Sequence, residues 1–93
     1  MDMNRQVLRS TKGGYNKTAV ITKLDSYNTL LVALEQGSID RVQALDELEK
    51  IRNTELPKEK GGLFGKIGFS EEDTDNYMED CEQMILKNLE SLI

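Results

Sequence analysis

Residues 16–37 read NKTAVITKLDSYNTLLVALEQG, and their apolar side chains recur at alternating steps of four and three. The positions are Val20, Leu24, Tyr27, Leu31 and Leu34. This spacing places them on one stripe of an α-helix, as in a coiled coil. Asn16 can cap the first free amides, and Gly37 can adopt the left-handed conformation that ends a helix. We therefore predict a helix over residues 17–36.

A second helix is predicted directly after the first. Ser38 is a suitable N-cap, and Lys50 and Arg52 suit the C-terminal end of the helix dipole. The apolar positions are Ile39, Val42, Leu45, Leu48 and Ile51. Pro57 disfavours helix in the residue before it, so we predict a helix over residues 39–53. The short Gly37-Ser38 junction forces these two helices into a hairpin.

A third amphipathic helix is predicted over residues 71–92. Ser70 and Asp73 resemble a capping box, and acidic residues fill the first turn. The apolar stripe consists of Met78, Cys81, Ile85, Leu89 and Leu92. Residues 54–69 hold four of the seven glycines, so we expect a long glycine-rich connection there. Residues 1–15 lack an apolar period and are predicted to be a loose basic arm.

The composition indicates one small all-α domain, over residues 16–93, without catalytic activity. The chain has 93 residues, and two domains of half that length could not each bury an adequate core. Histidine is absent, and Cys81 is the single cysteine, so we expect no cofactor, no metal and no disulfide. With no secretory leader, the sequence indicates a cytoplasmic protein. The predicted helices carry more apolar residues than one helix–helix contact can bury. This excess favours coiled-coil-like packing in a homodimer over a monomer whose three helices bury one another.

The charge is distributed unevenly along the chain. The net charge is −5, whereas residues 1–18 carry four bases and one acid, and residues 70–93 carry eight acids and one base. A basic head and an acidic tail suggest internal attraction or a basic partner for the tail. Nucleic acid is disfavoured as a partner, because phosphate binding needs a concentrated basic face.

Two helix starts share one pattern of glycine, aromatic residue and capping residue. The first copy is Gly14-Tyr15-Asn16-Lys17, and the second is Gly68-Phe69-Ser70-Glu71. In each, glycine allows a sharp entry and the aromatic residue can pack on the first turn. On this geometry alone, the two stretches are equally well explained as two unrelated, favourable helix starts.

The second copy continues as far as Met78 and resembles the signature of DivIVA-type cell-division proteins. Asp75 and Tyr77 match that signature, while Thr74 replaces its usual Val and Met78 its usual Leu. The first copy keeps the glycine, aromatic and capping residues of the helix start. It lacks the acid and the second aromatic residue at the positions where the signature has them. The resemblance implies a non-catalytic bacterial scaffold that gathers at the inner face of the membrane and recruits division or envelope-synthesis proteins. The long coiled-coil tail of that family is missing here, which puts higher-order assembly in doubt.

The glycine-rich connection contains a candidate membrane or partner loop. Its residues are Leu63, Phe64, Lys66 and Ile67. Apolar groups that leave water and cations that meet anionic headgroups would suit a peripheral membrane contact. A domain with few aromatic residues rarely leaves one exposed, so we expect Leu63, Phe64 and Ile67 to fold back onto the core instead.

The start of the third helix contains a candidate binding face for a basic partner. The face comprises Phe69, Glu72, Asp75, Tyr77 and Glu79. Its carboxylates could receive Arg or Lys side chains, while an aromatic ring stacks on them. Exposed charge runs are more often simply solvated, and this is the alternative interpretation. A generic protein-interaction domain or a small regulatory protein, without a membrane role, is the alternative function.

Overall fold

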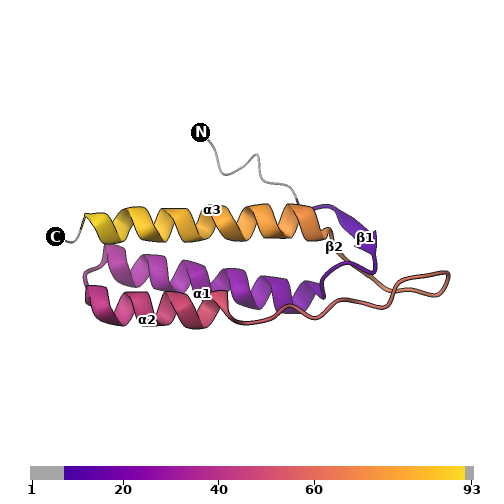
Figure 1. Cartoon of the computed structure of the whole chain (residues 1–93), viewed down its shortest axis with the longest axis horizontal. Helices are drawn as coiled ribbons and strands as arrows, with labels where there is room; N and C mark the ends of the chain where they lie inside the picture. Colours follow the sequence, from indigo (N-terminus) through magenta and orange to yellow (C-terminus); the bar gives the residue numbers. More distant parts are fainter. Residues whose placement is uncertain (1–7, 92–93) are drawn as a thin grey trace.

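The computed structural model describes residues 8–91 as three helices and a two-stranded ribbon (Figure 1). In chain order these are β1 (Ser10–Lys12), α1 (Lys17–Glu35), α2 (Arg41–Arg52), β2 (Ile67–Phe69) and α3 (Glu71–Glu90). The helices α1 and α3 both begin at the ribbon and run in the same direction, whereas α2 runs back antiparallel to them (Figure 1). The mostly helical architecture supports the predicted all-α class, but the two-stranded ribbon was not predicted.

Helix α1 has nearly the predicted bounds, and both of its predicted end signals are present. The Asn16 side chain accepts a hydrogen bond from the Ala19 amide at 2.9 Å. Gly37 has a φ of +70°, the left-handed conformation that favours glycine. The local sequence is therefore sufficient to explain where this helix begins and ends.

Helix α2 begins two residues later than predicted, because Asp40 rather than Ser38 caps it. The Asp40 carboxylate accepts from the Gln43 amide at 2.8 Å, and the Gln43 side chain accepts from the Asp40 amide at 3.2 Å. This reciprocal pair is a capping box and satisfies two free donors. The Ser38 hydroxyl instead donates to the Ala33 carbonyl at the end of α1.

Helix α3 is capped by Ser70, as predicted, but the predicted capping box is only half formed. The Ser70 hydroxyl accepts from the Asp73 amide at 3.3 Å. The Asp73 carboxylate does not reach back to Ser70, because it binds Arg9. Helix α3 ends at Glu90. The predicted end at position 92 lies outside the described residues.

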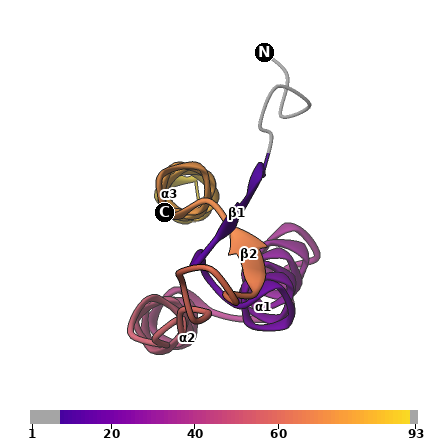
Figure 2. The same cartoon turned by 90° about the vertical axis from the view of Figure 1, so that its right-hand side faces the viewer.

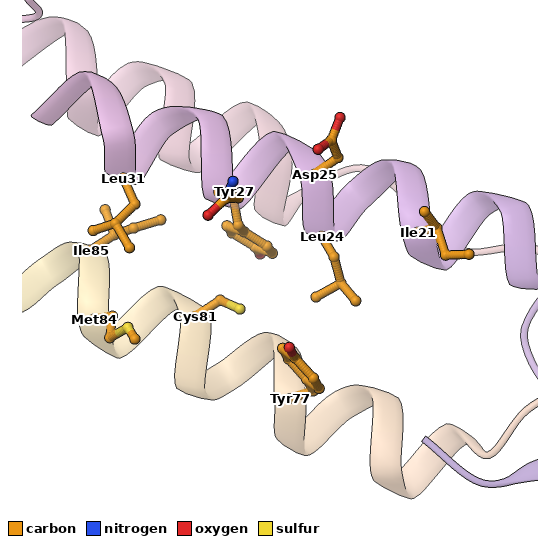
Figure 3. Close-up of a pocket in the computed structure, with 10 residues that line it drawn as sticks. Ile21, Leu24, Asp25, Tyr27, Leu31, Tyr77, Cys81, Met84 and Ile85 are labelled. Atoms are coloured by element: carbon orange, nitrogen blue, oxygen red, sulfur yellow. The ribbon is translucent and has the colours of Figure 1, made fainter. Parts of the chain in front are cut away.

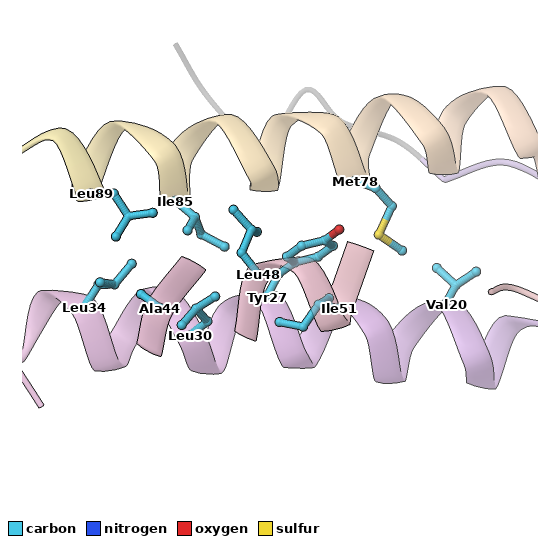
Figure 4. Close-up of a cluster of buried hydrophobic side chains, with 10 residues drawn as sticks. All are labelled: Val20, Tyr27, Leu30, Leu34, Ala44, Leu48, Ile51, Met78, Ile85 and Leu89. Carbon is cyan, nitrogen blue, oxygen red and sulfur yellow. The ribbon is translucent and has the colours of Figure 1, made fainter. Parts of the chain in front are cut away.

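The buried core lies between the three helices (Figure 4). Its members are Val20, Tyr27, Leu30, Leu34, Ala44, Leu48, Ile51, Met78, Ile85 and Leu89. Helix α2 contributes apolar residues at the spacing i, i+4 and i+7, which is one face of a helix. Helix α2 packs on one side of the α1–α3 pair, and the ribbon crosses one end of the bundle (Figure 2).

The predicted loose arm is wrong for residues 8–15, and the connection 54–69 is not irregular throughout. Strand β1 pairs antiparallel with β2, with Ser10 opposite Phe69 and Lys12 opposite Ile67. Residues 1–7 lie outside the described residues. The ribbon joins segments more than 50 positions apart in the chain. Neither segment has the length or the alternation that would predict a strand, so no local pattern indicates this pairing.

Candidate functional site

The two copies of the glycine–aromatic motif pair with each other. The Tyr15 amide donates to the Phe69 carbonyl at 2.9 Å, and the Phe69 amide donates to the Tyr15 carbonyl at 2.9 Å. A Cβ atom on Gly14 would lie 2.2 Å from the Phe69 oxygen, and one on Gly68 would lie 2.2 Å from the Tyr15 oxygen. Glycine is therefore required in both copies, so that the two backbones can touch.

The pairing relates α1 to α3 by an approximate twofold axis, with a constant offset of 54 positions. Tyr15 corresponds to Phe69, and both N-caps, Asn16 and Ser70, hold the amide three residues ahead. Val20 and Thr74 also correspond, and each has an exposed fraction of 0%. The repeat is thus a structural unit: two equivalent helix starts that place α1 and α3 in parallel.

The segment between α2 and α3 forms a hairpin whose two arms are hydrogen-bonded to the backbone in and beside the first motif copy. The Asn16 amide donates to the Pro57 carbonyl at 2.8 Å, and the Glu59 amide donates to the Gly14 carbonyl at 2.7 Å. On the other arm, the Gly13 amide donates to the Lys66 carbonyl at 3.0 Å. Because these backbone bonds hold both arms, the tip of the hairpin projects beyond the helices (Figure 1).

The tip of this hairpin is a turn with two exposed apolar residues. The Gly65 amide donates to the Gly62 carbonyl, so Leu63 and Phe64 are the central residues of the turn. Leu63 is 81% exposed and Phe64 92% exposed. The expectation that they fold back onto the core is wrong, because the hydrogen-bonded arms direct the turn away from the helices (Figure 1).

Cations surround this tip. Lys60 and Lys66 are exposed on its two arms, and the Lys66 amide donates to the Lys60 carbonyl at 2.9 Å. The Lys12 ammonium lies 3.5 Å from the Leu63 carbonyl. Ile67 is 54% exposed in β2, so it also belongs to this surface rather than to the core. We call Leu63, Phe64, Lys66 and Ile67, with Lys60, the hairpin tip.

Part of the predicted acidic face lines a cleft of about 590 Å³ beside the connection. Asp75 and Glu79 lie in it, together with Glu82. The same cleft contains Lys23, Arg52 and Lys58, so this chain itself supplies cations to it. The Glu82 carboxylate is already engaged, because Tyr27 donates to it at 2.7 Å and Arg52 pairs with it at 3.4 Å.

The other predicted members of that face are not brought together. Tyr77 lines a different groove, because residues two apart on a helix differ by about 200° in direction from the axis. The ring of Phe69 lies under the Lys17 ammonium, 5.0 Å from its centroid. Glu72 is exposed and does not line the cleft. The aromatic residue that joins Asp75 is Tyr15, whose hydroxyl donates to the carboxylate at 3.0 Å.

Burial and hydrogen bonds around the two motif copies change the pKa values of Asp73 and Tyr15. The Arg9 guanidinium and the Arg9 amide both donate to Asp73, which lowers the pKa of that carboxyl to about 2. Burial, followed by the hydrogen bond to Asp75, raises the pKa of the Tyr15 hydroxyl. Arg9 lies outside any predicted site, but its ion pair with Asp73 agrees with the predicted internal attraction between the basic head and the acidic tail.

An open apolar groove of about 490 Å³ lies between α1 and α3 (Figure 3). Its walls contain Ile21, Leu24 and Leu31 from α1 and Tyr77, Cys81 and Met84 from α3. Burial is the main cause that raises the pKa of the Cys81 thiol, to about 11, so this group is a poor nucleophile. Leu24, Leu31 and Cys81 were predicted on the apolar stripes of their helices, but the sequence did not separate the buried side of each stripe from the open one.

Among residues 8–91, no helix combines the length and the apolar character needed to cross a bilayer. Comparisons of the chain with protein-family models, with curated proteins and with solved structures find no match.

Proposed function

We propose that this protein is a non-catalytic adaptor that touches an anionic membrane surface through the hairpin tip. The single observation that carries the proposal is the exposure of Leu63 and Phe64 on a turn flanked by Lys60 and Lys66. Such a tip can place apolar groups below the headgroups while its cations remain at headgroup level. The likeness of its motif to DivIVA-type proteins favours a role in bacterial cell division or envelope growth.

The energetics favour a weak, reversible contact. Removing each exposed apolar side chain from water contributes about 1.5–3 kcal/mol at most, and each lysine near an anionic surface about 1 kcal/mol. Ordering the tip and orienting the protein oppose these terms. One tip therefore binds transiently, and stable localisation requires several copies or a second partner on the same structure.

Sedimentation with liposomes tests the membrane contact. We expect the protein to sediment with vesicles that contain anionic lipid, and to do so less as salt is added. Phe64→Asp should abolish the binding. Val42→Asp is the matched control, because Val42 is 77% exposed on α2, far from the tip, and should behave like wild type. Failure of wild type to sediment, or an equal loss in both variants, contradicts the proposal.

The alternative is a protein-interaction domain without a membrane role. The open α1–α3 groove favours it, because a contiguous apolar surface on a small domain commonly marks a protein contact. Sedimentation separates the two functions, since a purely protein-binding domain would stay in the supernatant with every vesicle composition.

A further inference from the structure

The two faces of the α1–α3 pair are equivalent by the approximate twofold axis, but only one is covered. Helix α2 packs on one face, and no described helix lies on the other (Figure 2). Residues 30 and 34 of α1 and 85 and 89 of α3 are buried in the core that α2 closes. Moving each by 54 positions gives Met84, Asn88, Leu31 and Glu35. Met84 and Leu31 line the open groove, so this groove is the counterpart of the α2 docking site.

Two further pairs agree with this correspondence. Tyr27, which is buried in the core beside α2, corresponds to Cys81, and Met78 corresponds to Leu24. Cys81 and Leu24 both line the open groove (Figure 3). The residues that correspond to Leu34 and Leu89 are the polar residues Asn88 and Glu35. The apolar part of the open groove is therefore shorter than the α2 docking site, and it lies closer to the ribbon.

We infer that the open groove binds an amphipathic helix of another protein, with apolar residues at i, i+4 and i+7 and basic residues beside them. Helix α2 supplies the template, because Ala44, Leu48 and Ile51 have this spacing and face the core. An arginine stands at each end of α2. Arg41 donates to the Leu89 carbonyl at 3.4 Å, and Arg52 pairs with Glu82.

The charge of the walls selects a basic helix and disfavours a second copy of this chain. Asp25 is the one charged residue among the described residues that line the groove, and Glu35 stands at the counterpart of Leu89, so both of these charges are negative. Asp25 lies at the α1 edge of the groove, exposed, and has no ion pair with any residue of 8–91. Two copies joined through this groove would oppose like charges, whereas a basic helix would be attracted. The inference does not depend on membrane binding by the hairpin tip.

Fluorescence anisotropy with the full chain and a labelled peptide tests the inference, without lipid. The peptide has the sequence of residues 41–52 with its three acids (Asp46, Glu47 and Glu49) replaced by Gln. We expect saturable binding that weakens about tenfold when Met84→Lys places a charge in the groove. Ile21→Lys is a second groove variant that should fold normally, because Ile21 is 57% exposed, and it should weaken binding similarly. Val42→Lys is the matched control and should bind like wild type.

Further measurements decide between occupants. Asp25→Asn should weaken this peptide severalfold, but should not affect a peptide in which Gln also replaces the three bases. Absence of saturable binding, or equal weakening by Val42→Lys, overturns the inference. Light scattering on the same proteins gives the remaining test: a wild-type dimer that Met84→Lys converts to monomer would assign the groove to a second copy and overturn the inference. Because lipid is absent throughout, failure here is independent of the liposome result.

Discussion

Substituting Gly68 by alanine tests the pairing of the two motif copies. The new Cβ would lie 2.2 Å from the Tyr15 oxygen and 2.6 Å from the Gly14 oxygen, and both of these are backbone atoms. The backbones must therefore separate, which breaks the two reciprocal bonds between Tyr15 and Phe69. Each buried backbone bond contributes about 1 kcal/mol net, and a group left unsatisfied adds to the loss. We expect the free energy of unfolding to fall by about 2–4 kcal/mol.

Thermal unfolding followed by circular dichroism measures this loss. For a domain of this size, each kcal/mol shifts Tm by about 4–8 °C, so Tm should fall by at least about 8 °C. Gly61→Ala is the matched control, because its φ is not left-handed and the nearest atom to its Cβ, the Gly13 Cα, is 3.8 Å away. That variant should change the free energy of unfolding by less than about 1 kcal/mol. A Gly68→Ala protein that melts like Gly61→Ala would refute the pairing.

Two further predictions concern Asp73 and Thr74. The pKa of Asp73 is lowered from 3.8 to about 2 by Arg9, so its stabilising contribution is present above pH 3.8 and is lost as pH falls toward 2. The difference in Tm between wild type and Asp73→Asn should therefore be larger at pH 5 than at pH 2, and a constant difference would contradict this. The Thr74 hydroxyl is buried without a hydrogen-bond partner among the described residues. Thr74→Val should therefore raise the free energy of unfolding in urea by about 1–2 kcal/mol, whereas Val20→Thr at the equivalent position should lower it; stabilities that move in the same direction would contradict the buried, unpaired hydroxyl.

The helices could be predicted because their signals are local. Alternating apolar steps, Asn16 and Gly37 define α1 without reference to the rest of the chain. The error at the start of α2 has a local cause as well, since Ser38 and Asp40 are both good caps and only Asp40 has Gln43 three residues ahead. The motif copies were also found in the sequence, because each is a short run of glycine, aromatic residue and cap.

The candidate sites were predicted only in part, because side-chain exposure depends on distant contacts. The residues of the hairpin tip were identified by their apolar and basic mixture, but their exposure results from backbone bonds to residues 13–16. The acidic face was predicted as one surface, whereas the direction of each residue around α3 divides it between a cleft and the opposite groove.

The sequence by itself determined three amphipathic helices, two equivalent helix starts and an acidic final helix, because periodicity, caps and charge act within a few residues. Only the tertiary structure decided that the two helix starts pair with each other. That contact joins Gly14 to Phe69 and Gly68 to Tyr15 across more than 50 residues. The tertiary structure also decided which side of the α1–α3 pair is covered. The short turn after Gly37 and the pairing of both hairpin arms place α2 on one face, and the other face stays open.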